Sequence, residues 1–204
     1  MIRPLWPKGV YPTIKFFYDT ETTGTDFRKH CIHQLSGFIE VDGEIYEEFD
    51  FKLSPHPKAI IEEEALKVSG VTLDEIKAYP DWKKVKGLIC DMMAKYVNRF
   101  DRKSKMWLVG YNNRAFDDQF FRKLFELSGD EYFNSWFYSD SRDVLVLASE
   151  YLESRRIDMK NFQLHTVAEA LGIVVEEEKL HDAMYDVYLT RQIYRIVTGR
   201  EIEL

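Results

Sequence analysis

The N-terminal part of the chain contains one stretch that decides the fold, residues 14–24, which reads IKFFYDTETTG. Its first five residues are aromatic or β-branched at four positions, which is typical of a buried β-strand. Side chains two apart on a strand point to the same face, so the strand end delivers the carboxylates of Asp19 and Glu21 to one patch, about 7 Å apart. Neighbouring carboxylates repel unless a cation neutralises them, and their oxygens suit Mg²⁺ or Mn²⁺. Taken alone, the same pattern also fits a solvated turn.

Further strands and helices are predicted after this stretch. Residues 34–41 (QLSGFIEV) are predicted to form a second strand, and residues 44–53, which alternate polar with apolar side chains, a third. Asp42-Gly43 between them is a strong hairpin signal. From residue 60 onward the apolar spacing becomes helical. The sequence predicts a buried strand at 106–110 and helices at 62–68, 72–78, 81 onward, 115–127, 143–152, 164–171 and 182–197.

These elements predict an α/β fold, in which a mixed central sheet with three N-terminal antiparallel strands is flanked by helices. Thr72, Asp81 and Asp182 are expected to cap their helices, and Glu75 completes a capping box with Thr72. The 204 residues fit a single domain at 13–204, preceded by an N-terminal arm at 1–12.

The composition excludes several classes of protein. With 45% hydrophobic and 15% aromatic residues the chain is not intrinsically disordered, and no apolar run reaches the roughly 18 residues that span a bilayer. The N-terminus lacks the apolar core of a secretory signal. Cys31 and Cys90 are too few for a disulfide framework and fit no zinc pattern, so we expect reduced thiols, a cytoplasmic location and no membrane partner.

The net charge of −7 argues against tight nonspecific binding of nucleic acid by the molecule as a whole. An acidic enzyme can still act on a phosphodiester when metal ions held by carboxylates supply the positive field.

Two further motifs carry acids at element ends. Asn113 to Asp117 lies between a predicted strand and a helix, and it places Asp117 in the first helical turn. His181 to Asp186 places His181 just before the last helix and Asp186 one turn inside it. Individually these fit a helix-stabilising acid and a surface histidine. Asp118 is expected to be a solvated helix acid.

Together the motifs predict one site. Ligand sites of α/β proteins lie where strand ends meet helix starts, and four carboxylates converging there need cations. Two divalent ions about 3.5 to 4 Å apart can be held in this way and act on an in-line phosphoryl displacement.

The three motifs, in this order, resemble those of the DEDDh 3′–5′ exonucleases, a superfamily that includes the proofreading subunit of bacterial replicative DNA polymerase, ribonuclease T and oligoribonuclease. The resemblance runs from about residue 14 to residue 194. It implies a ribonuclease H-like fold and release of nucleoside 5′-monophosphates from the 3′ end of single-stranded nucleic acid, with DNA favoured.

The resemblance also implies residue roles. Two divalent cations, Mg²⁺ or Mn²⁺, would be held by Asp19, Glu21, Asp117 and Asp186. His181 would be the general base, because an imidazole titrates near neutral pH. Contact with the terminal nucleotide would involve Thr22, Thr23, Gly24, Asn113 and Phe116, the last as packing under the site. Thr25 departs from the hydrophobic residue usual in the family, and Phe27 or another loop residue would then wedge the terminal base.

The sequence leaves the substrate and partners open. A 3′–5′ exoribonuclease uses the same chemistry, and an inactive exonuclease-like module of a polymerase complex is an alternative from another class. Retention of all four acids and the histidine favours an enzyme. Some family members are homodimers and others are DNA polymerase subunits.

Local basic runs and one aromatic run allow two interpretations each. The basic runs fit phosphate contacts or a solvated surface, and they are Arg28-Lys29-His30, Lys83-Lys84-Lys86, Arg99-Arg102-Lys103-Lys105 and Arg155-Arg156-Lys160. The aromatic run fits base stacking or core packing, and it contains Tyr132, Phe133, Trp136, Phe137 and Tyr138.

Overall fold

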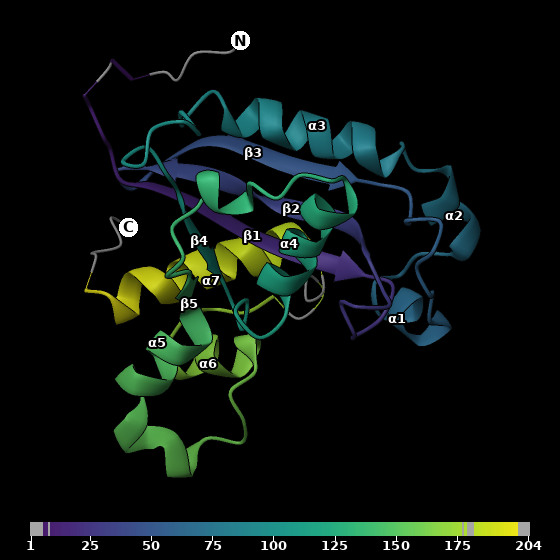
Figure 1. The fold of residues 1–204 in the computed structure, drawn as a ribbon. Helices are drawn as coiled ribbons and strands as arrows, with labels where there is room; N and C mark the ends of the chain where they lie inside the picture. Colours follow the sequence, from purple (N-terminus) through teal and green to yellow (C-terminus); the bar gives the residue numbers. More distant parts are fainter. Residues whose placement is uncertain (1–5, 8, 177, 179–181, 200–204) are drawn as a thin grey trace.

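The computed structural model describes residues 6, 7, 9–176, 178 and 182–199 (Figure 1). Its centre is a five-stranded sheet in the order β3-β2-β1-β4-β5. The strands are β1 (Ile14–Thr22), β2 (Ile32–Val41), β3 (Glu44–Lys52), β4 (Trp107–Gly110) and β5 (Arg142–Asp143). Strand β1 pairs antiparallel with β2 on one side and parallel with β4 on the other. The remaining pairs are β2–β3, which is antiparallel, and β4–β5, which is parallel. The predicted mixed sheet with three antiparallel N-terminal strands is confirmed.

Helices cover both faces of the sheet (Figure 1). One face carries α3 (Trp82–Met93) and α4 (Asp117–Leu127). The other carries α5 (Val144–Tyr151), α6 (Leu164–Ala170) and α7 (Ala183–Val197). The short helices α1 (Glu63–Val68) and α2 (Leu73–Ala78) lie beyond the end of β1 (Figure 1).

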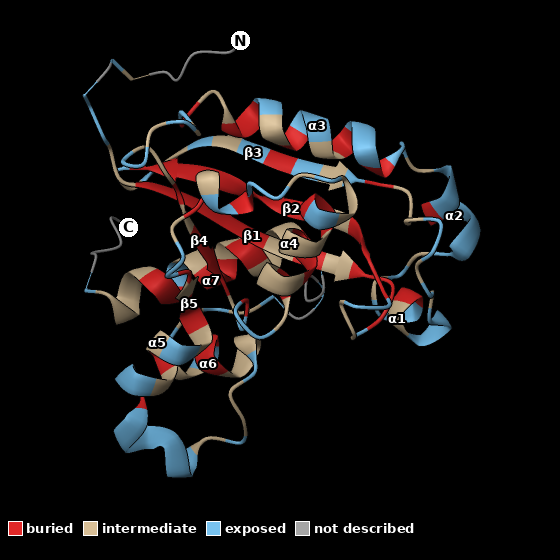
Figure 2. Cartoon of the chain, in the orientation of Figure 1, coloured by how far each residue is buried: buried red, intermediate tan, exposed pale blue. Residues whose placement is uncertain are grey.

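The central strand β1 is buried along most of its length (Figure 2). Alternate side chains enter different cores, because Phe16 and Tyr18 pack in the cluster with α3 and α4, whereas Phe17 packs with α5 and α7. A strand that is buried on both faces does not alternate polar with apolar residues. Residues 14–18 accordingly form an apolar run in which Lys15 is the one polar residue. Lys15 is buried and donates to Glu40 at 2.5 Å.

The predicted helix caps are confirmed. Thr72 and Glu75 form the reciprocal capping box, the Asp81 side chain accepts from the amides of residues 83 and 84, and Asp182 accepts from that of residue 185. Helix α4 begins at Asp117 instead of residue 115, because a tight turn occupies 112–116. In that turn Asn112 has a φ of 58° and the carbonyl of Asn113 accepts from the amides of residues 116 and 118.

A β-bulge lies at the end of the β1–β2 ladder. Glu21 pairs with Gln34 but Thr22 pairs with Ile32, which leaves His33 as the extra residue. The His33 side chain is fully buried, and within the described residues neither ring nitrogen has a hydrogen-bond partner. Burial lowers the pKa of His33 from 6.5 to about 4, with the charge of Lys52 adding to the effect.

His33 is expected to make the protein sensitive to acid. Since the folded pKa lies below the unfolded one, this group's contribution to stability is present above pH 6.5 and is lost as the pH falls towards about 4. The loss amounts to about 3 kcal/mol in the unfolding free energy by pH 4, of which about 2 kcal/mol falls between pH 7.5 and pH 5. Denaturant unfolding of the parent and His33→Leu at pH 7.5 and pH 5 measures it. The variant should lose less stability between these pH values, and equal losses would contradict the assignment.

No helix in the described part of the chain is both long enough and apolar enough to cross a membrane.

Candidate active site

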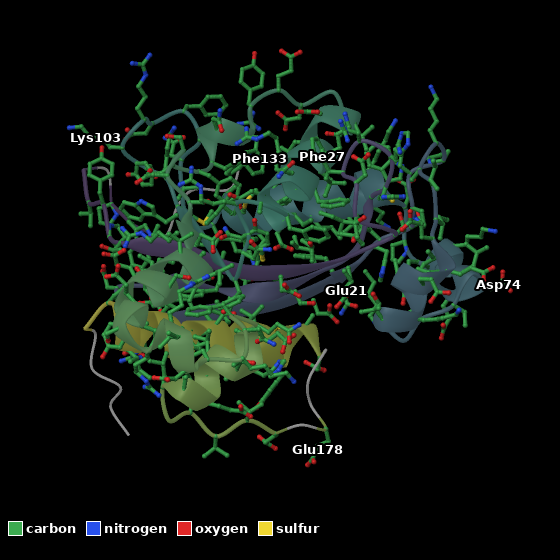
Figure 3. The ribbon with its side chains drawn as sticks, turned by 90° about the horizontal axis from the view of Figure 1, so that it is seen from below. Glu21, Phe27, Asp74, Lys103, Phe133 and Glu178 are labelled. Atoms are coloured by element: carbon green, nitrogen blue, oxygen red, sulfur yellow. The ribbon has the colours of Figure 1, made fainter. Side chains whose placement is uncertain are left out.

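The four predicted acidic residues lie at the ends of elements that the sheet brings together. Asp19 and Glu21 lie near the end of β1, Asp117 is the first residue of α4, and Asp186 lies in the first turn of α7. Strands β1 and β4 run parallel, so the end of β1 and the start of α4 after β4 share one edge of the sheet. Figure 3 shows Glu21 at this edge, on the opposite side of the molecule from Lys103.

The carboxyl of Asp19 is influenced by the other three acids. Burial raises the pKa of the Asp19 carboxyl well above its usual value, and the charges of Asp117, Glu21 and Asp186 raise it further. Burial also raises the pKa of Asp117 to about 7, although hydrogen bonds from Thr20 act in the opposite direction. The site therefore concentrates negative charge around Asp19.

Hydroxyl groups orient two of these carboxylates. The Thr20 hydroxyl donates to Asp117 Oδ1 at 2.5 Å, and the Thr20 amide donates to the same oxygen at 3.2 Å. The Ser69 hydroxyl, just after α1, donates to Glu21 Oε2. These bonds connect β1, α4 and the end of α1 around the site.

The donor set suits divalent cations by its chemistry. All four acids offer carboxylate oxygens, which Mg²⁺ and Mn²⁺ prefer, and their mutual repulsion is the kind that a cation relieves. In the part of the chain that is described, no three Asp, Glu, His or Cys side chains are arranged tightly enough to enclose one ion. Glu21 and Asp117 each accept a hydrogen bond from a nearby hydroxyl group.

Asp118 has a role that the sequence did not suggest. It accepts hydrogen bonds from the Tyr18 hydroxyl at 2.5 Å, the Asn113 amide at 3.0 Å and the Ser141 hydroxyl at 2.5 Å. The expectation of a solvated helix acid was wrong, because donors from three segments converge on it. Asp118 fixes the first turn of α4 to β1 and so fixes the neighbouring Asp117. The only available signal was the acid pair Asp117-Asp118, four and five residues after Asn113.

The turn after β1 is held by its own polar side chains. The Thr22 hydroxyl donates to the carbonyl of Gly24 at 2.9 Å, and the Thr23 hydroxyl donates to that of Ile60 at 2.8 Å. Gly24 has a φ of 156°, and a Cβ there would lie 2.6 Å from the ring of His30. Only glycine therefore fits at this position.

His30 is not a surface base. It is 5% exposed, and its Nδ1 accepts from the amide of Asp26 at 2.9 Å. The two other bases of that run, Arg28 and Lys29, pair with Asp26 at 2.8 and 3.7 Å. All three side chains of this run therefore contact Asp26 of their own loop.

Asn113 and Phe116 lie on the α4 side of the site. Asn113 is fully buried, and its side-chain amide donates a hydrogen bond to Asp118. The half-buried Phe116 ring lies 4.8 Å from that of Phe120, and the Phe27 ring approaches Phe120 edge-on at 6.5 Å. Phe27 and Phe116 are thus brought to one aromatic cluster beside Asp117. His181, the expected general base, lies outside the described residues, and the helix cap Asp182 directly follows it.

Comparison with known proteins identifies the family. The family model RNase_T, described as "Exonuclease", matches residues 16–194. The chain belongs to this exonuclease family. The predicted membership of the DEDDh exonuclease superfamily is confirmed.

Two curated relatives are similar over most of this chain. Exodeoxyribonuclease I of Escherichia coli K12 is 30% identical over 202 residues, which cover 92% of this chain and 40% of that enzyme. The DNA polymerase III subunit epsilon of Haemophilus influenzae is 24% identical, with 96% of this chain and 71% of the subunit covered. This exonuclease chain therefore spans less than half the length of the first relative.

Solved structures show the same fold. E. coli exonuclease I in complex with a dT13 oligonucleotide superposes with a TM-score of 0.72 at 25% identity, covering 92% of this chain and 41% of that one. The zinc-bound form of the same enzyme with single-stranded DNA gives a TM-score of 0.72 at 25% identity, with 93% and 41% covered. The predicted exonuclease fold is confirmed.

Proposed function

We propose that this member of the exonuclease family is a metal-dependent 3′–5′ exonuclease that hydrolyses single-stranded DNA from its 3′ end and releases nucleoside 5′-monophosphates. One observation carries the proposal: the charges of Glu21, Asp117 and Asp186 all act on Asp19. Four acids from distant parts of the chain are gathered at one sheet edge, although their repulsion opposes folding. Such a cluster is expected where cations are bound during catalysis.

The proposed roles follow from the placement of each group. Asp19, Glu21, Asp117 and Asp186 would hold two divalent cations, Mg²⁺ or Mn²⁺. Such ions, when bound, activate a water molecule and stabilise the leaving 3′-oxygen. His181, next to the start of α7, would accept the proton of the attacking water.

Other residues would keep this geometry fixed. The Thr20 hydroxyl holds the Asp117 carboxylate, and the bonds to Asp118 hold the first turn of α4. Thr22, Thr23 and Gly24 would shape the backbone against the terminal nucleotide, since both threonine hydroxyls point to main-chain carbonyls. Asn113 and Phe116 would support the same nucleotide from the α4 side.

Single-stranded DNA is proposed as the substrate on the strength of the comparisons. The first relative is named an exodeoxyribonuclease, and its solved structures hold single-stranded oligodeoxynucleotides. The second relative is a polymerase subunit, so a replicative polymerase is the proposed class of protein partner.

A nuclease assay tests the proposal directly. Purified protein with Mg²⁺ or Mn²⁺ should shorten 5′-labelled single-stranded DNA one nucleotide at a time from the 3′ end. Single-stranded RNA and blunt duplex DNA should be degraded more slowly. An excess of chelator should abolish the activity, because the proposed reaction depends on bound cations to lower the pKa of the attacking water and to stabilise the leaving oxygen. Digestion from the 5′ end, or undiminished activity in chelator, would refute the proposal. Binding of DNA without hydrolysis under any metal condition would favour the inactive module instead.

A further inference from the structure

Two segments that are distant in the sequence meet on one surface. The loop before β4 carries Arg99 and Phe100, and the segment after α4 carries Tyr132. The Arg99 guanidinium lies 5.7 Å from the Phe100 ring, 5.6 Å from the Tyr132 ring and 5.1 Å from the Trp136 ring. We call the group Arg99, Phe100 and Tyr132 the aromatic platform.

Its two outer rings are unusually exposed for their type. Phe100 is 80% exposed and Tyr132 is 66% exposed. Phe133, Trp136 and Phe137 of the neighbouring aromatic run are buried, so core packing is the right interpretation for those three. The guanidinium of Arg99 also lies over the Trp136 ring, and it pairs with the Asp130 carboxylate at 3.6 Å. The platform therefore presents rings that are held in place without being covered.

The charge beside the platform is positive. Of the nearby acids, Asp130 accepts from Lys86 at 2.5 Å and Asp101 accepts from the Tyr11 hydroxyl at 2.8 Å. Arg102 and Lys103 are exposed, and their side chains form no ion pair with any residue of the described chain. Glu131, next to Tyr132, is also exposed. The net positive charge is therefore small, and the rings are expected to supply the larger share of any binding energy.

The platform is separated from the acidic site by the length of α4. Asp117 begins this helix of 11 residues, and Tyr132 follows its other end. The helix is about 16 Å long, which corresponds to about five nucleotides at a stacked spacing of about 3.4 Å. In Figure 3, Lys103 near the platform and Glu21 in the site lie well apart, with Lys103 at one end of the molecule.

We propose that the aromatic platform is a second binding site for single-stranded nucleic acid, about five or more nucleotides from the 3′ end held at the acidic site. Unpaired bases would stack on Phe100 and Tyr132, and Arg102 and Lys103 would contact phosphates. Stacking suits this surface because every base has a face that can lie on an aromatic ring. This proposal rests on the proposed function for the direction of the strand, but binding at the platform is measurable without hydrolysis.

The test compares the parent with the double variant Phe100→Ala/Tyr132→Ala. Fluorescence anisotropy measures binding of oligothymidylates of about four and about twenty nucleotides in the presence of chelator, so that the strands stay intact. Loss of one stacking ring weakens binding by about fivefold or more, so the double variant should bind the long strand at least about 25-fold more weakly. Its affinity for the short strand should fall less, because a strand that cannot span α4 cannot occupy both sites at once and can still bind at the acidic site.

A matched control and the opposing outcomes complete the design. Tyr151→Ala removes a ring that is 56% exposed on α5 and should leave both affinities unchanged. Equal binding of the long strand by parent and double variant, or no binding by the parent, overturns the proposal. Self-association that disappears in the double variant would assign the platform to a second copy of the chain instead. If the parent binds but hydrolyses nothing, the proposed function fails while the platform stands.

Discussion

Replacing Asp19 by asparagine is expected to lower the rate of hydrolysis at the 3′ end by about 10³-fold or more while the protein remains folded. Metal ions contribute several kcal/mol of transition-state stabilisation, and each 1.36 kcal/mol corresponds to about a tenfold change in rate. Asp19 lies at the centre of the cluster, since the charges of the three other acids all act on it. Asparagine keeps the size of the side chain and removes its charge. The readout is kcat on labelled single-stranded DNA.

The same variant should become more stable when metal is absent. A carboxyl whose pKa is raised by folding destabilises the folded state once the pH rises above the unfolded value, because ionisation is then opposed by burial and repulsion. The asparagine side chain cannot ionise, so the Tm of Asp19→Asn in chelator at pH 7.5 should exceed that of the parent. Mn²⁺ should raise the Tm of the parent by binding the folded cluster, and it should raise that of the variant much less.

Asp74→Asn is the matched control for these measurements. Asp74 is an exposed acid in α2, far from Glu21 in Figure 3, and the same substitution there should change neither kcat nor the response to Mn²⁺. Full activity of Asp19→Asn would remove Asp19 from the catalytic cluster. If the Tm of Asp19→Asn in chelator is lower than that of the parent, the Asp19 carboxylate stabilises the folded state, and the expected destabilisation is wrong.

Much of the fold was predictable because local patterns agree with the tertiary structure. The apolar run at residues 14–18, the Asp42-Gly43 turn and the helix caps Thr72 and Asp81 each act within a few residues. The two-residue strand β5 was not predicted, since its pairing with β4 comes entirely from the assembled sheet. The 3₁₀ helix Glu153–Asp158 was also missed, because none of its residues is buried and no apolar period marks it.

The four acids of the site could be predicted because each lies at the end of a strand or the start of a helix, and such positions can be recognised from the neighbouring residues. Their mutual effect on Asp19 depends on how the sheet brings β1, α4 and α7 together. The roles of Asp118 and His30 were not predictable for the same reason. Each depends on partners that only the fold supplies, such as Tyr18 and Ser141 for Asp118. A charged residue whose partners are distant in sequence looks solvated until the structure is known.

Replacing His181 by alanine is expected to lower kcat by about 10²- to 10⁴-fold, which is the usual contribution of a general base. His181 directly precedes Asp182, which caps α7 and so fixes the position of Asp186 one turn later. The substitution should leave the fold intact, because the cap itself is unchanged.

The combination of two readouts distinguishes a base from a metal ligand. His181→Ala should keep the full increase in Tm with Mn²⁺, whereas Asp19→Asn should lose most of it. The pH dependence of kcat/KM should also differ between the parent and His181→Ala, since the substitution removes a group that would accept a proton during the reaction. His165→Ala, in α6 on the other face of the sheet from α4, is the control that should retain both activity and pH profile. If His181→Ala hydrolyses DNA as fast as the parent, another group must accept the proton, and the base has to be sought among the residues around Asp117.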